Sequence, residues 1–282
     1  MIIKDHFLDG EEIKQMQTPN TSGEFAAGMP DTIVIHFTAG SSAESSAKHL
    51  CRERTKASAH LVIGRDANIF QLAPFNIITW HAGRSSWETA TGEERTGLNK
   101  FSIGIELDNA GELNDNGNGK YLSWFNRFYS EDEVFLGTHR NRNIPSHWHA
   151  YSSEQIETTF ELCHLLCEHY PITEIVGHEE IAPGRKTDPG PAFPLERLRT
   201  GLLSEGRRPD LPAEPVVELA ERAVVSASQL NIRNGPGAQF EPAADPLIRG
   251  TVVKPVRQQD GWTEVEYTVK GWVSSKYIED KV

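Results

Sequence analysis

The chain has 282 residues, so a prior of about 150 residues per domain predicts one large domain or two of unequal size. Twenty-eight Lys and Arg against 40 Asp and Glu give a formal net charge of −12, which argues against nucleic acid as a partner because phosphates would be repelled. No apolar run approaches the roughly 20 residues of a membrane span, and the hydrophobic content of 38% excludes the disordered class.

The N-terminus shows no secretory signal, because acidic residues come early and no long apolar stretch precedes Ile33. We therefore expect a product that is cytoplasmic as synthesised, and release to the wall or periplasm by a holin or a secretion system stays open. Three cysteines, Cys51, Cys163 and Cys167, cannot all pair with one another, so reduced thiols are expected. The oligomeric state is left open, with a monomer as the simplest case.

Residues 1–204 alternate strand-like apolar segments with helical patterns, which predicts an α/β domain with a central mixed β-sheet flanked by helices. The first strand is expected over 32–37, a hairpin over 60–72 around Asp66-Ala67-Asn68, and further strands over 101–107 and 173–176. Helices are expected over 43–54, 153–170 and 195–204. In the second helix Cys163 and Cys167 fall on the apolar stripe, which predicts buried thiols.

Residues 111–152 are longer than a simple connection. Five aromatic residues in this insertion follow the spacing i, i+3, i+4, i+7, i+8, which predicts a helix with one aromatic face: Tyr121, Trp124, Phe125, Phe128 and Tyr129. Packing of this face onto the domain is the favoured interpretation. A sugar-stacking lip and a dimer contact remain alternatives.

Prolines 209, 212 and 215 stand at every third position, which predicts a semi-rigid linker over 205–221. Short strand patterns follow over 223–227, 230–233, 251–257, 262–267 and 271–274, and they predict a small C-terminal all-β barrel over 222–282. This segment holds eight basic and seven acidic residues, so residues 1–221 carry a charge of −13. The asymmetry is a further indication of two units.

Three segments place a possible metal ligand beside unusual backbone: IVIHFTAG with His36, GHEEI with His178, and GRKTDPGP with Asp188. Two imidazoles and one carboxylate suit a catalytic zinc, because three protein ligands leave the fourth tetrahedral position open. Strand alternation turns His36 away from Ile35 and Phe37, and the proline after Asp188 keeps that residue extended.

Glu106 lies on the strand FSIGIEL, on the same face as Ser102 and Gly104. A rigid strand gives a carboxylate the fixed placement that a general base requires. The alternative is an ordinary solvent-facing strand residue.

IVIHFTAG, ASAHLVIGRD, TWHAGRSSW, LNKFSIGIEL and IVGHEEIAPGRKTDPGPAFP, in this order, closely resemble the zinc-dependent N-acetylmuramoyl-L-alanine amidases of the type-2 (AmpD-like) family, relatives of the peptidoglycan-recognition proteins. The resemblance covers about residues 30–200. It implies one Zn²⁺ ion, and hydrolysis of the amide between the lactyl group of N-acetylmuramic acid and the L-alanine of the peptide stem.

The resemblance also assigns roles to single residues. It implies that His36, His178 and Asp188 are the zinc ligands, that Glu106 is the catalytic glutamate, and that Lys186 stabilises the tetrahedral oxyanion. Trp80, His81 and Ala82 of the WHAG segment are then expected to line the substrate groove, and His60 to be structural. Arg65 and Arg95 are candidate partners for stem-peptide carboxylates, with solvated charges as the alternative.

The segments LNIRNGPG and GWVSSKYI resemble bacterial SH3-like domains, which often accompany wall hydrolases and bind peptidoglycan. Such a domain would concentrate the enzyme on its polymer. We therefore expect peptidoglycan or muropeptides as partners, with an endolysin-like setting on intact wall. A cytosolic amidase that recycles anhydro-muropeptides, a non-catalytic peptidoglycan-binding protein, and a zinc peptidase that cuts within the stem remain alternatives.

Overall fold

A computed structural model describes residues 1–10, 13–203, 222–225, 229–235, 243–259 and 262–267. The chain divides into two compact units, Met1–Gly206 and Arg207–Val282. The predicted linker over 205–221 and the predicted strand over 271–274 lie outside the described residues.

A mixed six-stranded sheet forms the centre of the first unit. Its strands, in spatial order, are β17 (Glu174–Gly177), β5 (Thr32–Phe37), β11 (Ser102–Leu107), β6 (Leu61–Ile63), β7 (Ile69–Gln71) and β3 (Ile13–Gln15). All neighbours run parallel except β6 and β7, which form the predicted hairpin. The prediction of a central mixed sheet is therefore confirmed.

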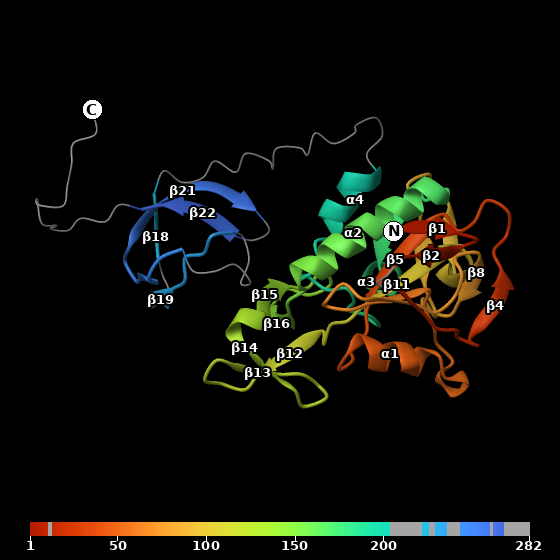
Figure 1. The fold of residues 1–282 in the computed structure, drawn as a ribbon, viewed down its shortest axis with the longest axis horizontal. Coiled ribbons are helices and arrows are strands. Elements are labelled where there is room, and N and C mark those ends of the chain that lie inside the picture. The colour runs from red at the N-terminus through yellow and green to blue at the C-terminus, as the bar shows by residue number, and fades with distance from the viewer. Residues whose placement is uncertain (11–12, 204–221, 226–228, 236–242, 260–261, 268–282) are drawn as a thin grey trace, which may run out of the picture. The chain divides into compact units, whose positions relative to one another are not determined.

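The two faces of this sheet differ in what they bury. One face packs α2 (Ser153–His169) and α4 (Leu195–Leu203) against a continuous aliphatic core that includes Ile33, Ile35, Ile103 and Ile105. The other face carries α1 (Ala43–Leu50) at one side. Figure 1 shows α1 on the opposite side of the sheet from α2 and α4. Polar side chains of β5 and β11 therefore face the α1 side, away from the main core.

The predicted helices are present with small changes at their ends. Helix α1 ends at Leu50 rather than at residue 54, and a 3₁₀ turn, η1 (Glu53–Thr55), follows it. Serine side chains cap the first turns of α1 and α2, as expected for N-cap residues. Cys163 is buried on α2, so the prediction of a buried thiol is confirmed there, whereas Cys167 is only partly buried against the same core.

The expectation that strands begin at residue 32 is wrong. Four short strands precede it: β1 (Ile2–Lys4), β2 (Phe7–Asp9), β3 and β4 (Thr21–Glu24), the last paired with β8 (Ile77–Thr79). They are three or four residues long and largely exposed, so they carry almost no periodic apolar signal. The remaining short elements are β9 (Ser86–Glu88), β10 (Glu94–Thr96), η2 (Leu98–Lys100) and α3 (His178–Ile181).

The predicted aromatic helix over 121–129 is also wrong, because the insertion forms a five-stranded antiparallel sheet. This inserted sheet comprises β12 (Glu112–Asp115), β13 (Lys120–Leu122), β14 (Phe128–Ser130), β15 (Val134–Thr138) and β16 (Pro145–His149), with the 3₁₀ turn η3 (Glu131–Glu133) between β14 and β15. A tight turn between Ser123 and Arg127, with Asn126 at a φ of 64°, brings Tyr121 opposite Tyr129. Two aromatics eight residues apart can therefore share a hairpin face as well as a helix face.

The second unit shows five short strands among its described residues: β18 (Ala223–Val224), β19 (Gln229–Leu230), β20 (Leu247–Ile248), β21 (Val252–Gln259) and β22 (Trp262–Glu266). Val225, Leu247 and Val253 form its small core. The strands agree with the expected all-β pattern, and β20 was not predicted. The identity of this unit as an SH3-like barrel stays a prediction.

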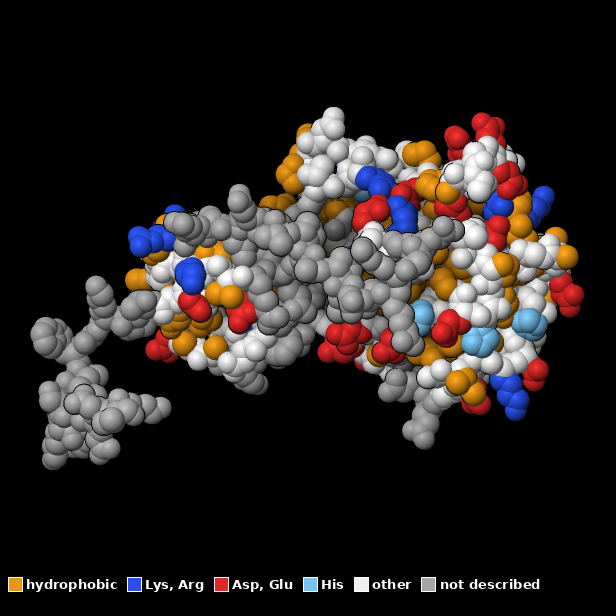
Figure 2. Space-filling view, turned by 90° about the horizontal axis from the view of Figure 1, so that it is seen from above, with side chains coloured by type: hydrophobic (Ala, Val, Ile, Leu, Met, Phe, Trp, Pro, Cys, Tyr) orange, Lys and Arg blue, Asp and Glu red, His pale blue; other side chains and the backbone are white. Residues whose placement is uncertain are grey.

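None of the helices in the described part of the chain has the length and apolar character needed to cross a membrane. Figure 2 shows acidic side chains scattered over the visible face of the larger unit, with fewer basic ones among them. This distribution agrees with the negative charge counted for residues 1–221.

The core between the sheet and α2 gives a stability prediction. Ile105 is fully buried, so Ile105→Ala should lower the free energy of unfolding by about 2–5 kcal/mol through lost burial and a residual cavity. Leu136→Ala is the control, because Leu136 lies on the inserted sheet with 61% of its surface exposed. Urea unfolding followed by far-UV circular dichroism measures both, and equal midpoints would contradict this description of the core.

Candidate active site

Three buried side chains from separate segments converge on the polar face of the central sheet. His36 comes from β5, His178 begins α3, and Asp188 lies in the loop ten residues later. The His36 Nδ1 atom lies 2.9 Å from His178 Nδ1 and 3.0 Å from Asp188 Oδ2, and the last two atoms are 2.9 Å apart. The structure therefore brings the three predicted ligands into one compact triangle of donor atoms.

Hydrogen bonds orient the His178 ring so that Nδ1 faces the triangle. Its Nε2 atom lies 3.2 Å from the carbonyl oxygen of Ala82, which can only accept a hydrogen bond. This carbonyl favours the tautomer with the proton on Nε2, in which Nδ1 keeps a free lone pair, while Arg185 Nη2 lies farther from Nε2 at 3.4 Å. Metal-binding histidines are commonly fixed in this way by a carbonyl on the far ring nitrogen.

A longer chain of the same kind orients His36. The His81 Nε2 atom lies 3.1 Å from the Ser102 carbonyl oxygen, so His81 donates there and keeps an acceptor at Nδ1. That Nδ1 lies 3.0 Å from His36 Nε2, which must then be the donor. The lone pair of His36 Nδ1 is again directed at the triangle.

This arrangement changes the expectation for His81. Both of its ring nitrogens are engaged inside the protein and the residue is only 8% exposed, so no polar atom of the ring is left for a substrate. Gly104 makes room for it, because a Cβ at this position would overlap the His81 ring. The glycine in the sequence SIGIEL is therefore needed because any side chain at this position would overlap the His81 ring.

Burial keeps the imidazoles of His36 and His81 neutral, and metal ligation requires a neutral imidazole. It lowers the pKa of His36 to about 4, with His178 adding to the effect and Asp188 opposing it. Burial also lowers the pKa of His81 well below its usual value. Burial would raise the pKa of Asp188, but the adjacent His178 and His36 outweigh it and lower the pKa, so the carboxylate stays ionised.

Glu106 is the direct neighbour of His36 in the parallel ladder between β11 and β5, so both side chains leave the same face of the sheet. Its Oε2 atom is inaccessible and has no hydrogen-bond partner among the described residues. Burial raises the pKa of Glu106 well above its usual value, Asp188 adds to this, and Lys186 opposes it. A carboxyl group without a hydrogen-bond partner, placed beside the three candidate metal-ligand atoms, is suited to proton transfer.

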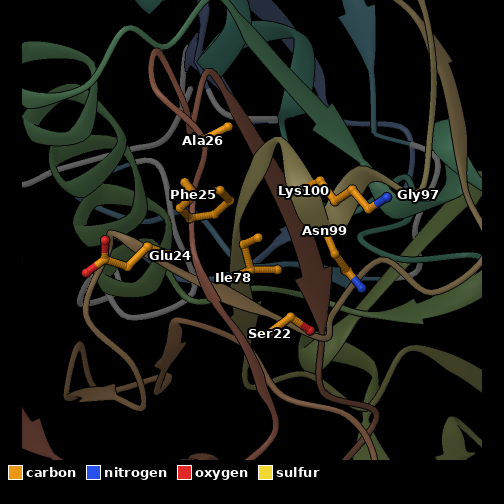
Figure 3. A pocket seen from close by; sticks show the side chains of 8 residues that line it. All are labelled: Ser22, Glu24, Phe25, Ala26, Ile78, Gly97, Asn99 and Lys100. Carbon is orange, nitrogen blue, oxygen red and sulfur yellow. The ribbon is translucent and has the colours of Figure 1, made fainter.

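The WHAG segment links this cluster to a cavity of about 500 Å³. Asn99 Oδ1 accepts hydrogen bonds from the backbone N–H groups of His81 and Ala82, and Trp80 Nε1 donates to Ser22 Oγ at 2.6 Å. Ser22 and Asn99 both line the cavity, together with Glu24, Phe25, Ala26, Ile78, Gly97 and Lys100. Figure 3 shows Phe25 and Ile78 on one side, with Asn99 and Lys100 across from them.

The two candidate arginines have partners within the protein. Arg65 Nη1 donates to the Ala150 carbonyl at 2.7 Å, and Arg95 is paired with Asp31 and Glu93 at 2.7 and 2.8 Å. Neither arginine lines the cavity.

Sequence reasoning missed two residues of the site. Asn99 holds the WHAG backbone, and Arg185 donates to the carbonyl oxygens of Ala82 and Arg84 at 2.9 and 2.7 Å. Both residues lie inside motifs that were noticed, but their contacts are to backbone atoms far along the chain. His60 has the expected structural role, because its Nε2 donates to the Ile77 carbonyl and its Nδ1 accepts from Gly104 N–H.

Comparisons with known proteins show which proteins the chain is similar to. A family model described as N-acetylmuramoyl-L-alanine amidase matches residues 26–191, which is more than half of the chain. Over 152 residues the chain is 34% identical to the 1,6-anhydro-N-acetylmuramyl-L-alanine amidase AmpD of Escherichia coli, covering 53% of this chain and 61% of that protein. Over 203 residues it is 29% identical to the N-acetylmuramoyl-L-alanine amidase AmiD of the same organism, covering 64% and 61%.

Among solved structures, a selenomethionine derivative of AmpD aligns with a TM-score of 0.48 and 27% identity, covering 72% of this chain and all of that one. The chain spans about three fifths of the length of the curated relatives it matches.

The packing of His81 under Gly104 gives a prediction for metal binding. Gly104→Ala should displace the His81 ring, disturb the orientation of His36, and weaken Zn²⁺ binding by about 10-fold or more. Gly201→Ala is the control, because a Cβ there would meet nothing within 4 Å. Competition with a chromophoric chelator measures both, and equal affinities would show that His81 does not orient His36.

Proposed function

Because the chain belongs to the N-acetylmuramoyl-L-alanine amidase family, we propose that it hydrolyses the amide between the lactyl group of N-acetylmuramic acid and the L-alanine of a peptidoglycan stem. One observation carries the proposal: Glu106 lies beside His36 in the same ladder, with a buried and unpaired carboxylate oxygen. A protein that only binds peptidoglycan would not need that costly arrangement.

The donor set fits a single Zn²⁺ ion. Two neutral imidazoles and one carboxylate are typical ligands of catalytic zinc, and their spacing of 2.9–3.0 Å is close to the roughly 3.3 Å edge that zinc–ligand distances of about 2 Å give. We assign His36, His178 and Asp188 to this ion. When bound, zinc supplies Lewis-acid polarisation of the scissile carbonyl and makes an adjacent water more acidic.

The protein's own groups then move the protons. Glu106 accepts a proton from the attacking water and returns it to the departing amine of L-alanine. Its raised pKa assists the second step, because a weakly acidic carboxyl group holds the proton until the amine leaves. Lys186, whose charge acts on both Glu106 and His36, stabilises the developing oxyanion.

The peptide stem is assigned to the cavity beside the WHAG segment. Its wall combines the apolar Phe25 and Ile78 with the amide of Asn99 and the exposed ammonium group of Lys100. Such a mixed lining suits a short peptide that carries carboxylates. Trp80 and Ala82 take part through the backbone and indole contacts that connect the cavity to the metal cluster.

Two settings remain distinct. The curated relatives include amidases named for anhydro-muropeptides and one named for N-acetylmuramoyl-L-alanine, and both fit the same chemistry. We favour intact wall, because an SH3-like second unit would serve a polymer better than a small soluble substrate. The negative first unit would be repelled by anionic wall polymers, so moderate salt should strengthen binding to such walls.

Replacement of Glu106 tests the mechanism. Glu106→Gln should lower kcat by a factor of about 10²–10⁴ while zinc content is retained, because the proton acceptor is lost but the ligands stay. Purified sacculi and a soluble anhydro-muropeptide are the two substrates, and mass spectrometry identifies the products. A new L-alanine N-terminus indicates an amidase, whereas cleavage inside the stem would indicate a zinc peptidase.

If the wild-type protein binds sacculi but cuts neither substrate, the enzymatic interpretation is wrong and the protein is a peptidoglycan-recognition protein. Asp132→Asn, an exposed change in the turn η3, is the matched acid-to-amide control and should keep full activity. The substrate that is cut faster identifies the setting.

A second change tests the cavity. Lys100→Met should raise KM for the stem substrate by about 3- to 10-fold and leave kcat almost unchanged, because Lys100 contacts the stem and not the reacting atoms. Lys120→Met, an exposed lysine on β13, is the control. An unchanged KM for Lys100→Met would show that the peptide stem does not bind in this cavity.

A further inference from the structure

The two segments that supply His178 and Asp188 have little stability of their own. His178 begins α3, which has only four residues, and isolated helices of that length do not persist in water. Asp188 lies in a loop whose backbone is joined to α3 by the hydrogen bond from Glu179 N–H to the Asp188 carbonyl at 2.8 Å. Contacts from elsewhere must therefore hold both ligands in place.

Glu179 makes several of these contacts. It is only 5% exposed, and its Oε2 atom accepts a hydrogen bond from Gly190 N–H at 3.1 Å, beyond Asp188 in the same loop. The same oxygen lies in contact with Nε2 of His139, which belongs to the turn between β15 and β16, at 2.7 Å and without the alignment of a hydrogen bond. One carboxylate thus joins α3, the Asp188 loop and the inserted sheet.

His139 is itself held rigidly. It is 1% exposed, its ring stacks on Trp148 at 5.7 Å with an interplanar angle of 21°, and its Nδ1 accepts the Asn141 N–H at 3.2 Å. The Asn141 side chain also donates to the Glu179 carbonyl at 3.1 Å. The turn therefore contacts both the side chain and the backbone of Glu179.

Two aromatic residues from the end of the insertion reach the other side of the loop. Trp148 lies so close to Gly190 that a Cβ there would be 3.0 Å from its ring, and Tyr151 donates its hydroxyl to the Pro189 carbonyl at 2.8 Å. Every one of these contacts falls within two residues of His178 or Asp188.

We propose that the inserted sheet is a clamp that positions His178 and Asp188 for the metal ion, with His139 and Glu179 as its positioning residues. The inference rests on the proposed function in one respect, the assignment of zinc to His36, His178 and Asp188. It gives residues 111–152 a role in the active site, although none of them supplies a ligand.

Metal affinity separates this role from a general contribution to stability. A clamp changes the arrangement of ligands in a protein that stays folded, whereas a stabilising contact changes only the melting temperature. The probes are Zn²⁺ alone, titrated against a chromophoric chelator, and the visible absorption spectrum of Co²⁺ bound in its place. Both use the full chain.

His139→Phe keeps the stacking on Trp148 but removes the nitrogen that faces Glu179. We expect it to weaken Zn²⁺ binding by about 10- to 100-fold and to alter the Co²⁺ spectrum. His147→Phe is the matched control, because His147 lies on the same sheet and its recorded ring contact is with Tyr121 alone among the described residues. It should bind zinc as wild type does.

Two substitutions of Glu179 distinguish the effect of its contacts from the effect of its negative charge. Glu179→Leu should weaken zinc binding as strongly as His139→Phe, while Glu179→Gln should stay within about threefold of wild type, because the amide oxygen still accepts from Gly190 N–H and keeps its contact with His139 Nε2. Equal losses in Glu179→Leu and Glu179→Gln would mean that the negative charge acts, and would overturn the clamp.

Asn141→Ala keeps the test decisive if a buried variant fails to fold, because Asn141 is exposed and its side chain contacts the Glu179 carbonyl. It should weaken zinc binding by about threefold. Wild-type affinity in the folded His139→Phe or Asn141→Ala protein would overturn the clamp. A wild-type chain that does not bind zinc would instead overturn the proposed function, and this result is read before any variant is compared.

Discussion

The site depends on the register between two parallel strands. Ile103 to Leu107 of β11 lie opposite Ile33 to Phe37 of β5, so Glu106 and His36 occupy neighbouring positions on one face. A shift by one residue would turn Glu106 into the aliphatic core and leave His36 without a proton acceptor beside it. The core residues on the opposite face resist that shift, because each would lose its burial between the sheet and α2. Hydrophobic packing therefore fixes the distance between the catalytic groups.

Buried polar groups near the cluster are arranged so that each has a defined donor or acceptor. The hydrogen bonds that run from the Ser102 carbonyl through His81 to His36 leave the lone pair of His36 Nδ1 free for a metal ion. The contact between His178 Nε2 and the Ala82 carbonyl favours the same arrangement in His178. Burying such groups without partners would cost several kcal/mol, so the network selects one ring orientation for each histidine. Glu106 is an exception next to the ligands themselves, since one of its oxygens has no partner among the described residues. An exception of this kind is expected where chemistry takes place.

Sequence reasoning recovered the central strands, the long helices and the candidate ligands because these carry local signals. The alternation in IVIHFTAG and FSIGIEL predicted which side chains leave the core, and the main core indeed contains the alternate isoleucines of both strands but neither His36 nor Glu106. It failed for the N-terminal strands, whose few exposed residues carry no periodic pattern. It also failed for Tyr121 and Tyr129, because a spacing of eight residues fits both a helix and a hairpin, and the left-handed conformation of Asn126 decides for the hairpin.

The contacts that sequence reasoning could not find share one property, a long separation along the chain. His139 meets Glu179 forty residues later, and Asn99 holds backbone atoms 17 and 18 residues earlier. Nothing in the local pattern around His139 distinguishes it from the histidines at 147 and 149, which have no contact with the metal-binding loop among the described interactions. Only the path of the inserted sheet makes that distinction, because it returns the turn after β15 to the side of α3. The insertion is thus better understood as part of the frame of the metal centre than as an appendage to it.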